Sequence, residues 1–287
     1  MKASNGIGSL FFLFIAISTA NGQTYVRNNA NGANDGSSWA DAYTNLQTAL
    51  SNAPSGEIWV AQGTYYPTSC TPCTEADKEI AFRLPPGVQL YGGFAGDETA
   101  RNQRDWTAHP TILSGDIGVP GDSTDNVFNV VIAENATAAT FLDGFIIEEG
   151  NADGSFGFSA GGGLYLDANP GGTADLQVRH CTFRNNYAGG GGAVAIDCVL
   201  GGSSRAVFRD CRFEGNTASL RVVSSGGAVF MHGNGGAQLL PRFVSCTFRN
   251  NYCGNDGGAF SATPTGAGSL LAFVIDSCEF TDNRAAD

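Results

Sequence analysis

The chain has 287 residues, of which 42% are apolar, only 15% are charged and 40 are glycines. This length suits one elongated domain or two ordinary ones. Glycine at such a frequency, without a collagen period, is typical of a β protein with many turns. The formal charge of −12 argues against nucleic acids and anionic membrane surfaces as partners, because like charges repel. An acidic chain of this kind remains compatible with cation binding.

Residues 1–22 are predicted to form a signal peptide. Lys2 precedes an apolar stretch over residues 10–17, and small residues follow up to Gly22. The apolar stretch is too short to cross a bilayer, and no other segment is long enough. We therefore expect a secreted chain that contains no transmembrane segment.

Residues 23–60 are predicted to form an N-terminal cap and a first strand. The clearest helical pattern of the chain lies near residues 40–52, where the apolar side chains share one face. Pro54 ends this pattern, and Glu57–Ala61 then reads as a buried strand. A repeat domain needs a cover for its first unit, and an amphipathic helix ahead of the first strand suits that role.

Residues 61–160 carry further strand patterns separated by Pro, Gly and Asp turns. We interpret them as the first, less regular coils of a repeat domain that extends over residues 61–287. The predicted strands are Ala81–Leu84, Val88–Tyr91, Thr111–Leu113, Val127–Ile132 and Phe141–Ile147.

From residue 161 onward the same short phrase occurs four times, which predicts a solenoid of stacked units. The cysteines of the phrase Cys-x-Phe-x-x-Asn are 30, 35 and 32 residues apart. The phrase consists of Cys181, Phe183 and Asn186; Cys211, Phe213 and Asn216; Cys246, Phe248 and Asn251; and Cys278, Phe280 and Asn283. A double glycine precedes each phrase, at Gly162-Gly163, Gly191-Gly192, Gly226-Gly227 and Gly257-Gly258.

Each repeat favours short strands and turns over a helix, and its length suits one coil of a parallel β-helix. Side chains alternate along a strand, so Cys and Phe of one phrase share a face. Neighbouring coils lie about 4.8 Å apart, which stacks Phe over Phe in the interior and Cys over Cys beside it. The Asn residues are expected to hydrogen-bond backbone groups at a corner, and the glycines to form a bend without space for a Cβ atom.

The eight cysteines of an exported chain raise the question of disulfides. Cys70 and Cys73 lie in one loop. Three alternatives remain open for them: a local disulfide, two free thiols, or half of a metal site. The column of repeated cysteines is expected to be reduced and buried, because parallel side chains give a poor disulfide torsion. Cys198 and Cys253 lie outside this column and could pair with its members.

One glycine-rich loop, residues 115–126, concentrates oxygen ligands. Asp116, Asp122, Asp125 and Asn126 could bind a calcium ion, or they could form an ordinary turn with solvated carboxylates. No other cofactor is expected. The three histidines, His109, His180 and His232, show no spacing of a metal site, and surface or turn roles are predicted for them.

Several stretches of the sequence resemble bacterial secreted right-handed parallel β-helix proteins. The Gly-Gly-Ala-Val and Phe-x-x-Asn phrases are similar to the repeats of polymorphic outer-membrane proteins. The matching stretches are Tyr25-Val26, Asn34–Trp39, Leu46–Leu50, Glu57–Tyr65, Leu90–Gly96, Ile112–Asp116 and Leu142–Ile147.

This resemblance implies an all-β, pectin-lyase-like β-helix that is secreted or exposed at the bacterial outer surface. It implies an adhesin-like role and no catalytic residue that can be placed in this sequence. Members of the family often continue into a C-terminal sorting or membrane domain, and we therefore expect a further domain beyond Asp287.

The function predicted from these patterns is that of a non-enzymatic scaffold which adheres to cell-surface or extracellular glycans or proteins. The alternative is a polysaccharide lyase or glycoside hydrolase on the same fold. Lys78 is the only lysine after the signal peptide, so the base of a lyase would have to be an arginine. A groove in which two or more Asp, Glu or Arg side chains converge would favour an enzyme.

Overall fold

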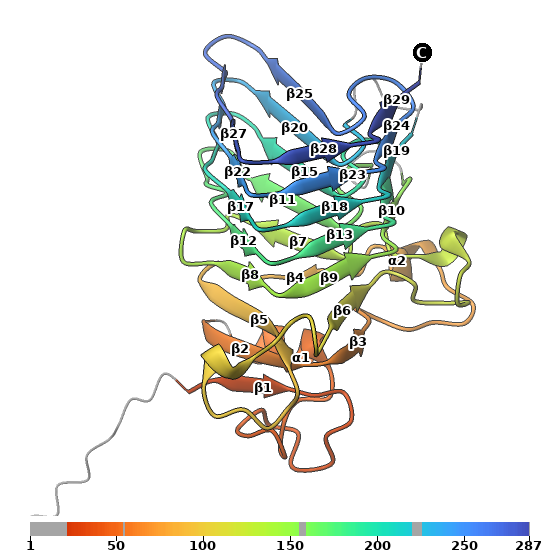
Figure 1. Ribbon diagram of the computed structural model, residues 1–287, viewed down its shortest axis with the longest axis vertical. Coiled ribbons are helices and arrows are strands. Elements are labelled where there is room, and N and C mark those ends of the chain that lie inside the picture. Colours follow the sequence, from red (N-terminus) through yellow and green to blue (C-terminus); the bar gives the residue numbers. More distant parts are fainter. Residues whose placement is uncertain (1–21, 54, 155–158, 220–225, 287) are drawn as a thin grey trace, which may run out of the picture.

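A computed structural model describes residues 22–53, 55–154, 159–219 and 226–286. The chain winds into a right-handed parallel β-helix (Figure 1). Strands such as β13 run from left to right across the near face while the chain climbs, and strands such as β15 return behind them, which is the usual hand for parallel crossovers. The predicted signal peptide, residues 1–22, lies outside the described residues except for Gly22.

The described residues form five parallel sheets, which we name A to E. Sheet A contains β1 (Thr24–Val26), β2 (Gly56–Ala61), β5 (Val88–Phe94), β8 (Phe141–Asp143), β12 (Gln177–Arg179), β17 (Val207–Arg209), β22 (Arg242–Val244) and β27 (Val274–Asp276). Sheet B contains β3 (Gly63–Tyr65), β6 (Thr111–Ser114), β9 (Phe145–Glu148), β13 (Thr182–Arg184), β18 (Arg212–Glu214), β23 (Thr247–Arg249) and β28 (Glu279–Thr281). Sheet C contains β4 (Phe82–Arg83), β7 (Val131–Glu134), β11 (Leu164–Ala168), β15 (Val194–Cys198), β20 (Val229–Asn234) and β25 (Phe260–Thr265).

Two narrower sheets complete the coils. Sheet D contains β10 (Asn151–Ala152), β14 (Tyr187–Ala188), β19 (Thr217–Ala218), β24 (Tyr252–Cys253) and β29 (Arg284–Ala285). Sheet E contains β16 (Ser203–Ser204), β21 (Gln238–Leu239) and β26 (Leu270–Leu271). Every strand pair is parallel and joins one coil to the next, so equivalent positions of the repeat lie side by side.

The phenylalanines of the repeated phrase form a stack in the interior. Ring centroids are 5.2 Å apart between Phe183 and Phe213, 4.5 Å between Phe213 and Phe248, and 4.9 Å between Phe248 and Phe280. The first three are fully buried, whereas Phe280 belongs to the last described coil and is 47% exposed. In the four coils that carry the phrase, the core is therefore a column of phenylalanines along the helix axis, and Ile147 and Leu113 continue it in the earlier coils.

The asparagines of the phrase form a second column at the corner between sheets B and D. The amide nitrogen of Asn186 donates to Oδ1 of Asn216 (3.0 Å), and Asn216 donates in the same way to Asn251 (3.0 Å). Each Oδ1 also accepts the backbone N–H of the asparagine one coil earlier, at 3.2 and 3.1 Å for these two pairs. In the coils that carry the phrase, the ladder satisfies the buried polar groups of these asparagines.

The double glycines occupy another corner of the coil. In the first repeat, the pair that aligns with the other double glycines begins one residue earlier than predicted. Leu164 pairs with Val194, so Gly161-Gly162 is equivalent to Gly191-Gly192. The prediction Gly162-Gly163 was wrong because three consecutive glycines leave the sequence phrase ambiguous. A Cβ atom on Gly192 would lie 2.6 Å from the carbonyl oxygen of Gly227, which explains the requirement for glycine.

The predicted N-terminal helix is present but shorter. The helix α1 (Leu46–Asn52) begins after Asn45, whose side chain accepts the N–H of Thr48 and caps the first turn. Its buried residues pack against β1, β2 and β4, at the edge of sheet C that the first coil leaves uncovered. The other helical segments are α2 (Glu75–Lys78) and the 3₁₀ turns η1 (Arg101–Gln103) and η2 (Ser123–Asp125). Within the described residues, none of the helices has the length and hydropathy to span a membrane.

Candidate functional site

A groove of 370 Å³ lies on the outer face of sheet C. Its walls include Tyr165 of β11, Asp197 of β15, and Phe230 and His232 of β20. Apolar walls with a few convergent polar groups are the usual composition of a ligand site. This groove is therefore the candidate functional site.

The groove follows from the sequence of sheet C and from the register of its strands. Tyr165, Ala195 and Phe230 are paired in register across three consecutive coils. Because these residues point outward at the same level, the small side chain of Ala195 leaves a hollow between two aromatic rings. The next outward position holds Asp167, Asp197 and His232 in the same order.

The Asp197 carboxylate is fixed by two donors from neighbouring coils. The Tyr165 hydroxyl donates to its Oδ2 (3.0 Å), and Nδ1 of His232 donates to its Oδ1 (2.8 Å). Burial raises the pKa of Tyr165, as does the charge of Asp197, so its hydroxyl keeps its proton.

Asp167 lies beside Asp197 and has acidic side chains on both neighbouring coils. Burial, the charge of Asp197 and the charge of Glu134 raise the pKa of Asp167 to about 6. Glu134, Asp167 and Asp197 are paired in register on β7, β11 and β15, so three carboxyl groups stand in one row. Two carboxyl groups in different environments, on adjacent strands, form the arrangement from which acid and base roles can be divided.

A second cluster lies where sheets A and B meet. Asp143 accepts hydrogen bonds at Oδ1 from Nδ1 of His180 (2.9 Å) and from Arg104 (2.8 Å), and the Trp106 ring stacks on His180 at 4.2 Å. Although burial alone would raise it, the bond from His180 and the charge of Arg104 hold the pKa of Asp143 below its usual range. The adjoining cavity has a volume of 410 Å³ and includes Arg212.

This second cluster ties a long loop to the helix. Arg104 also donates to the carbonyl oxygens of Gly92 and Asp143, both at 3.1 Å. His180 and Arg104 thus both contact the buried Asp143 carboxylate. The Trp106 ring packs against His180 and against the Arg104 guanidinium. We interpret the cluster as the anchor of the loop that contains Arg104 and Trp106.

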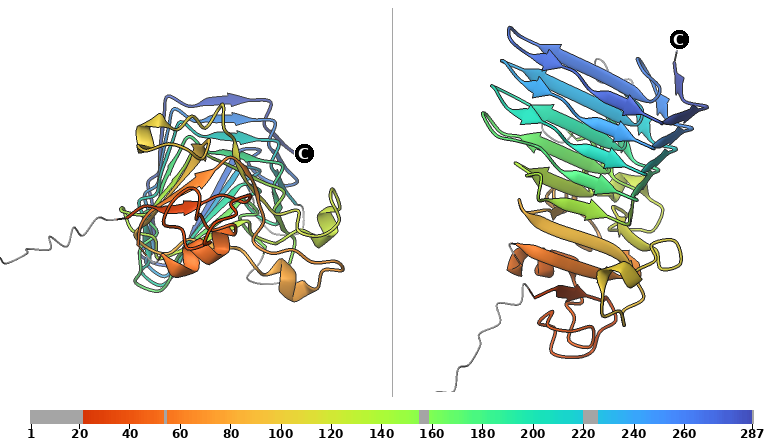
Figure 2. Two further views of the ribbon diagram at one scale, coloured as in Figure 1. Left: turned by 90° about the horizontal axis from the view of Figure 1, so that it is seen from below. Right: turned by 60° about the vertical axis from the view of Figure 1, so that its left-hand side comes forward.

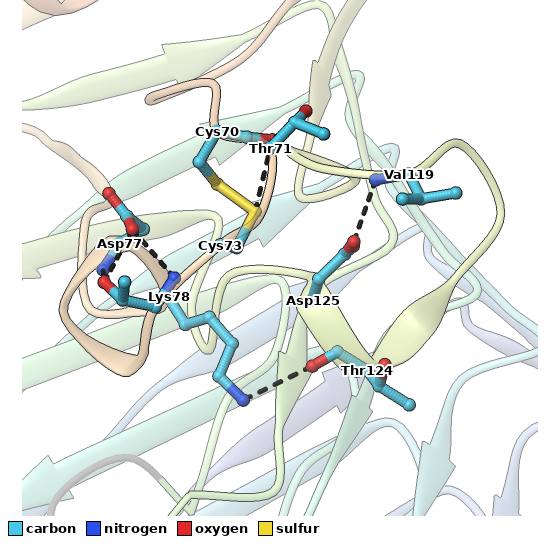
Figure 3. The surroundings of a disulfide bond; sticks show 9 residues. Cys70, Thr71, Cys73, Asp77, Lys78, Val119, Thr124 and Asp125 are labelled. Carbon is cyan, nitrogen blue, oxygen red and sulfur yellow. Dashed lines mark hydrogen bonds between the residues drawn. A yellow bond between two sulfur atoms is a disulfide. The ribbon is translucent and has the colours of Figure 1, made fainter.

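The cysteines separate into one disulfide and six thiols. Cys70 and Cys73 form a disulfide in the loop before α2 (Figure 3). Cys198 lies in β15 and Cys253 in β24, on different sheets; both are buried thiols and neither is disulfide-bonded to the repeated cysteines. The repeated cysteines Cys181, Cys211 and Cys246 are buried thiols, and Cys278 is partly exposed.

The residues predicted to bind calcium take part in turns. Asp122 is exposed and caps η2 by accepting the N–H of Thr124 (3.0 Å). The other three, Asp116, Asp125 and Asn126, lie at the base of the same loop. In the described part of the chain, no group of three His, Cys, Asp or Glu side chains could hold a metal ion by itself.

The groove residues Asp197 and His232, and Asp167 next to Asp197, were not predicted from the sequence, although a signal for them exists. With the double glycines aligned as in the structure, the first glycine of a pair is followed six residues later by Asp167, Asp197 or His232. The misplaced first repeat concealed this column. His232 was expected to have a surface or turn role, and the structure places it in the groove beside Asp197.

The likeness of this chain to known proteins is weak. No protein-family model matches the chain, and no curated protein matches it. Among solved structures, the pectin methylesterase from Aspergillus niger is similar over 90% of this chain and 85% of that chain, with 15% sequence identity and a TM-score of 0.36. A likeness of this size carries no argument about activity.

Proposed function

We propose that this chain is a secreted or cell-surface β-helix scaffold that binds extracellular glycans in the groove of sheet C. The observation that carries the proposal is the hollow between Tyr165 and Phe230, with the fixed carboxylate of Asp197 at its side. Sugar rings present apolar C–H faces to aromatic side chains and hydroxyl donors to carboxylates, and this groove offers both partners.

The charge of the groove narrows the class of glycan. Glu134, Asp167 and Asp197 stand in one row on the face that forms the groove. Carboxylate groups on a ligand would be repelled there, so neutral or amino sugars are favoured over uronic acids. The stacked coils hold the groove rigid, which suits adhesion at a bacterial surface, where an adhesin-like β-helix would act.

The proposal is tested with the purified chain on an array of neutral, amino-sugar and uronic acid glycans. We expect saturable retention of neutral or amino-sugar glycans, which are recovered unchanged. Asp197→Asn removes the charge that orients Tyr165 and His232, so it should weaken retention at least tenfold. Asp276→Asn, at an exposed position of sheet A, is the matched control and should bind normally. Absence of retention on every neutral and amino-sugar glycan would refute glycan binding.

A second candidate function, glycoside hydrolysis, is favoured by the Asp167 and Asp197 pair. A protonated carboxyl group beside an ionised one is what glycosidic cleavage requires, and burial together with neighbouring charges raises the pKa of Asp167 to about 6. Asp167 would donate the proton to the leaving oxygen, and Asp197 would act as base or nucleophile. The rate would then fall as the pH rises through about 6, because Asp167 loses its proton.

The two candidates are separated by incubating neutral polysaccharides with the chain and measuring new reducing ends. Hydrolysis predicts products that disappear in both Asp167→Asn and Asp197→Asn. The scaffold function predicts none, even from glycans that are retained on the array.

A further inference from the structure

Among the described residues, most of the buried side-chain polar atoms that lack a hydrogen bond lie in the loop of residues 115–126 or on β10 beside it. Six such side-chain atoms occur among the described residues, and four of them are oxygens at this loop or at the strand beside it. They are Oδ1 of Asp116, Asp125, Asn126 and Asn151. Burying an oxygen acceptor without a partner costs free energy, so four at one place require an explanation.

The backbone brings these four residues together. Val127 N–H donates to the carbonyl oxygen of Gly115 (3.0 Å), which closes the loop and places Asp116 and Asn126 at its two ends. Asn151 of β10 donates its N–H to the carbonyl oxygen of Val127 (2.8 Å) and so lies on the next coil, beside the closed end.

Each of the four side chains is already fixed by its other polar atom. Oδ2 of Asp116 accepts the N–H of Gly121 (3.0 Å), and Oδ2 of Asp125 accepts the N–H of Val119 (2.8 Å), which Figure 3 shows. The amide nitrogen of Asn126 donates to the carbonyl oxygen of Glu149 (2.8 Å).

Asn151 is held in the same manner, because its amide nitrogen donates to the carbonyl oxygen of Ser123 (2.6 Å). Asn126 is 4% exposed and Asn151 is 9% exposed, so these amide groups are largely removed from solvent. The remaining oxygens are therefore preorganised acceptors, and no protein donor reaches them within the described residues.

The charges around the loop favour a cation. Asp116 and Asp125 place two carboxylate groups in the loop, and a further acidic residue, Glu149, lies beside Asn126, which donates to its carbonyl oxygen. The nearest lysine, Lys78, donates to the carbonyl oxygen of Thr124 (3.3 Å) and pairs with Glu75 (2.9 Å). Its ammonium group is engaged with these partners.

We propose that this junction binds a calcium ion through the side-chain oxygens of Asp116, Asp125, Asn126 and Asn151. Calcium takes six to eight oxygen ligands in a flexible geometry, and carboxylate and amide oxygens are its usual protein ligands. A zinc-type centre does not fit, because the donor set holds no sulfur or imidazole. Relative to the sequence prediction, Asn151 joins the set and the exposed Asp122 leaves it.

The inference is tested by calorimetric titration of the chelator-treated full chain with calcium chloride, together with thermal unfolding. We expect saturable binding of one ion per chain and a rise in melting temperature of several degrees. Magnesium chloride at equal concentration should leave the melting temperature unchanged, because magnesium demands a stricter octahedral site.

Variants of the same loop supply the matched comparison. Asp116→Asn and Asp125→Asn each keep the shape of the side chain but remove a ligand charge, so each should weaken calcium binding at least tenfold. Asp122→Asn makes the same charge change at a position outside the site and should bind as the wild type does. No saturable calcium binding by the wild-type chain, an equal response to magnesium, or an equal loss in Asp122→Asn would overturn the proposal, and the wild-type titration decides it even where a variant fails to fold.

Discussion

At the scale of single residues, the row of carboxyl groups beside the groove places two aspartates in different environments. Asp167 has acidic neighbours in register on both sides, Glu134 and Asp197, whereas Asp197 is flanked on its other side by His232. Asp197 also accepts two hydrogen bonds. Two chemically identical side chains on adjacent coils therefore stand in different environments, and this difference has consequences for stability.

Asp167→Asn should stabilise the fold at neutral pH and have little effect in acid. The pKa of Asp167 is raised to about 6 in the folded chain from an ordinary value of 3.8, so the folded state binds its proton more tightly. Stability is therefore lost as the pH rises from about 4 to about 6, and the full penalty applies above that range. Melting temperatures of the wild type and the variant should diverge over this range, whereas the exposed Asp153→Asn control should track the wild type.

A stabilisation that is independent of pH in Asp167→Asn would contradict the raised pKa. A destabilisation at neutral pH would show that the charged carboxylate makes favourable contacts in the folded chain.

Cysteine reactivity should follow the depth of each thiol. Burial raises the pKa of Cys181 to about 12, and burial likewise raises that of Cys198 to about 12. A thiol reacts as its thiolate, so these residues should resist alkylation by iodoacetamide at about pH 8. Cys278, on the last described coil and partly exposed, should be the first of the six thiols to react, as peptide mapping by mass spectrometry would show. Early modification of Cys181 would contradict the buried column.

At the scale of elements, each column of the repeat is a chain of identical contacts between coils. The Phe183, Phe213 and Phe248 rings stack in the interior, and the asparagine amides form a ladder at the corner. Removing a middle member of such a column interrupts contacts in both directions. Removing an end member affects one direction only.

Asn216→Ala should therefore cost more than Asn283→Ala. Asn216 donates to the carbonyl oxygen of Phe183 and to Asn251, and its Oδ1 accepts from Asn186. Buried partners left without a hydrogen bond cost about 1–3 kcal/mol each, so a loss of at least about 2 kcal/mol is expected. Asn283 lies on the last described coil and is less buried. Urea unfolding measures both variants, and equal losses would mean that the ladder does not act as a column.

The elements also show what the sequence can and cannot predict. The columns of Cys181, Phe183 and Asn186 follow from periodicity alone, because equal spacing in a solenoid means stacking. The groove does not, since its walls depend on the register of sheet C, and the glycine run before Leu164 allows more than one alignment. The sequence could not place Asn151 beside the loop of residues 115–126, because only the hydrogen bond from its backbone N–H to Val127 brings it next to that loop.

At the scale of the whole molecule, the rod divides into an irregular N-terminal half and regular coils above it. The loops that contain α2, η1 and η2 project from the N-terminal coils, whereas the coils from β11 onward are nearly uniform (Figure 2). The proposed calcium site lies among these irregular loops, where a bound ion would hold loop residues together. The glycan groove lies on the uniform part, where the strands themselves fix its walls.

The binding affinity of one neutral or amino-sugar oligosaccharide, chosen from the array, tests the glycan-binding groove most directly. Calorimetry of the wild type and of Phe230→Ala compares the groove with and without one aromatic wall. Tyr252→Ala removes an exposed aromatic side chain from sheet D and serves as the control. We predict that Phe230→Ala weakens binding at least tenfold, or about 1.4 kcal/mol, while Tyr252→Ala binds as the wild type does. Unchanged affinity in Phe230→Ala, or an equal loss in Tyr252→Ala, would contradict the assignment of the groove.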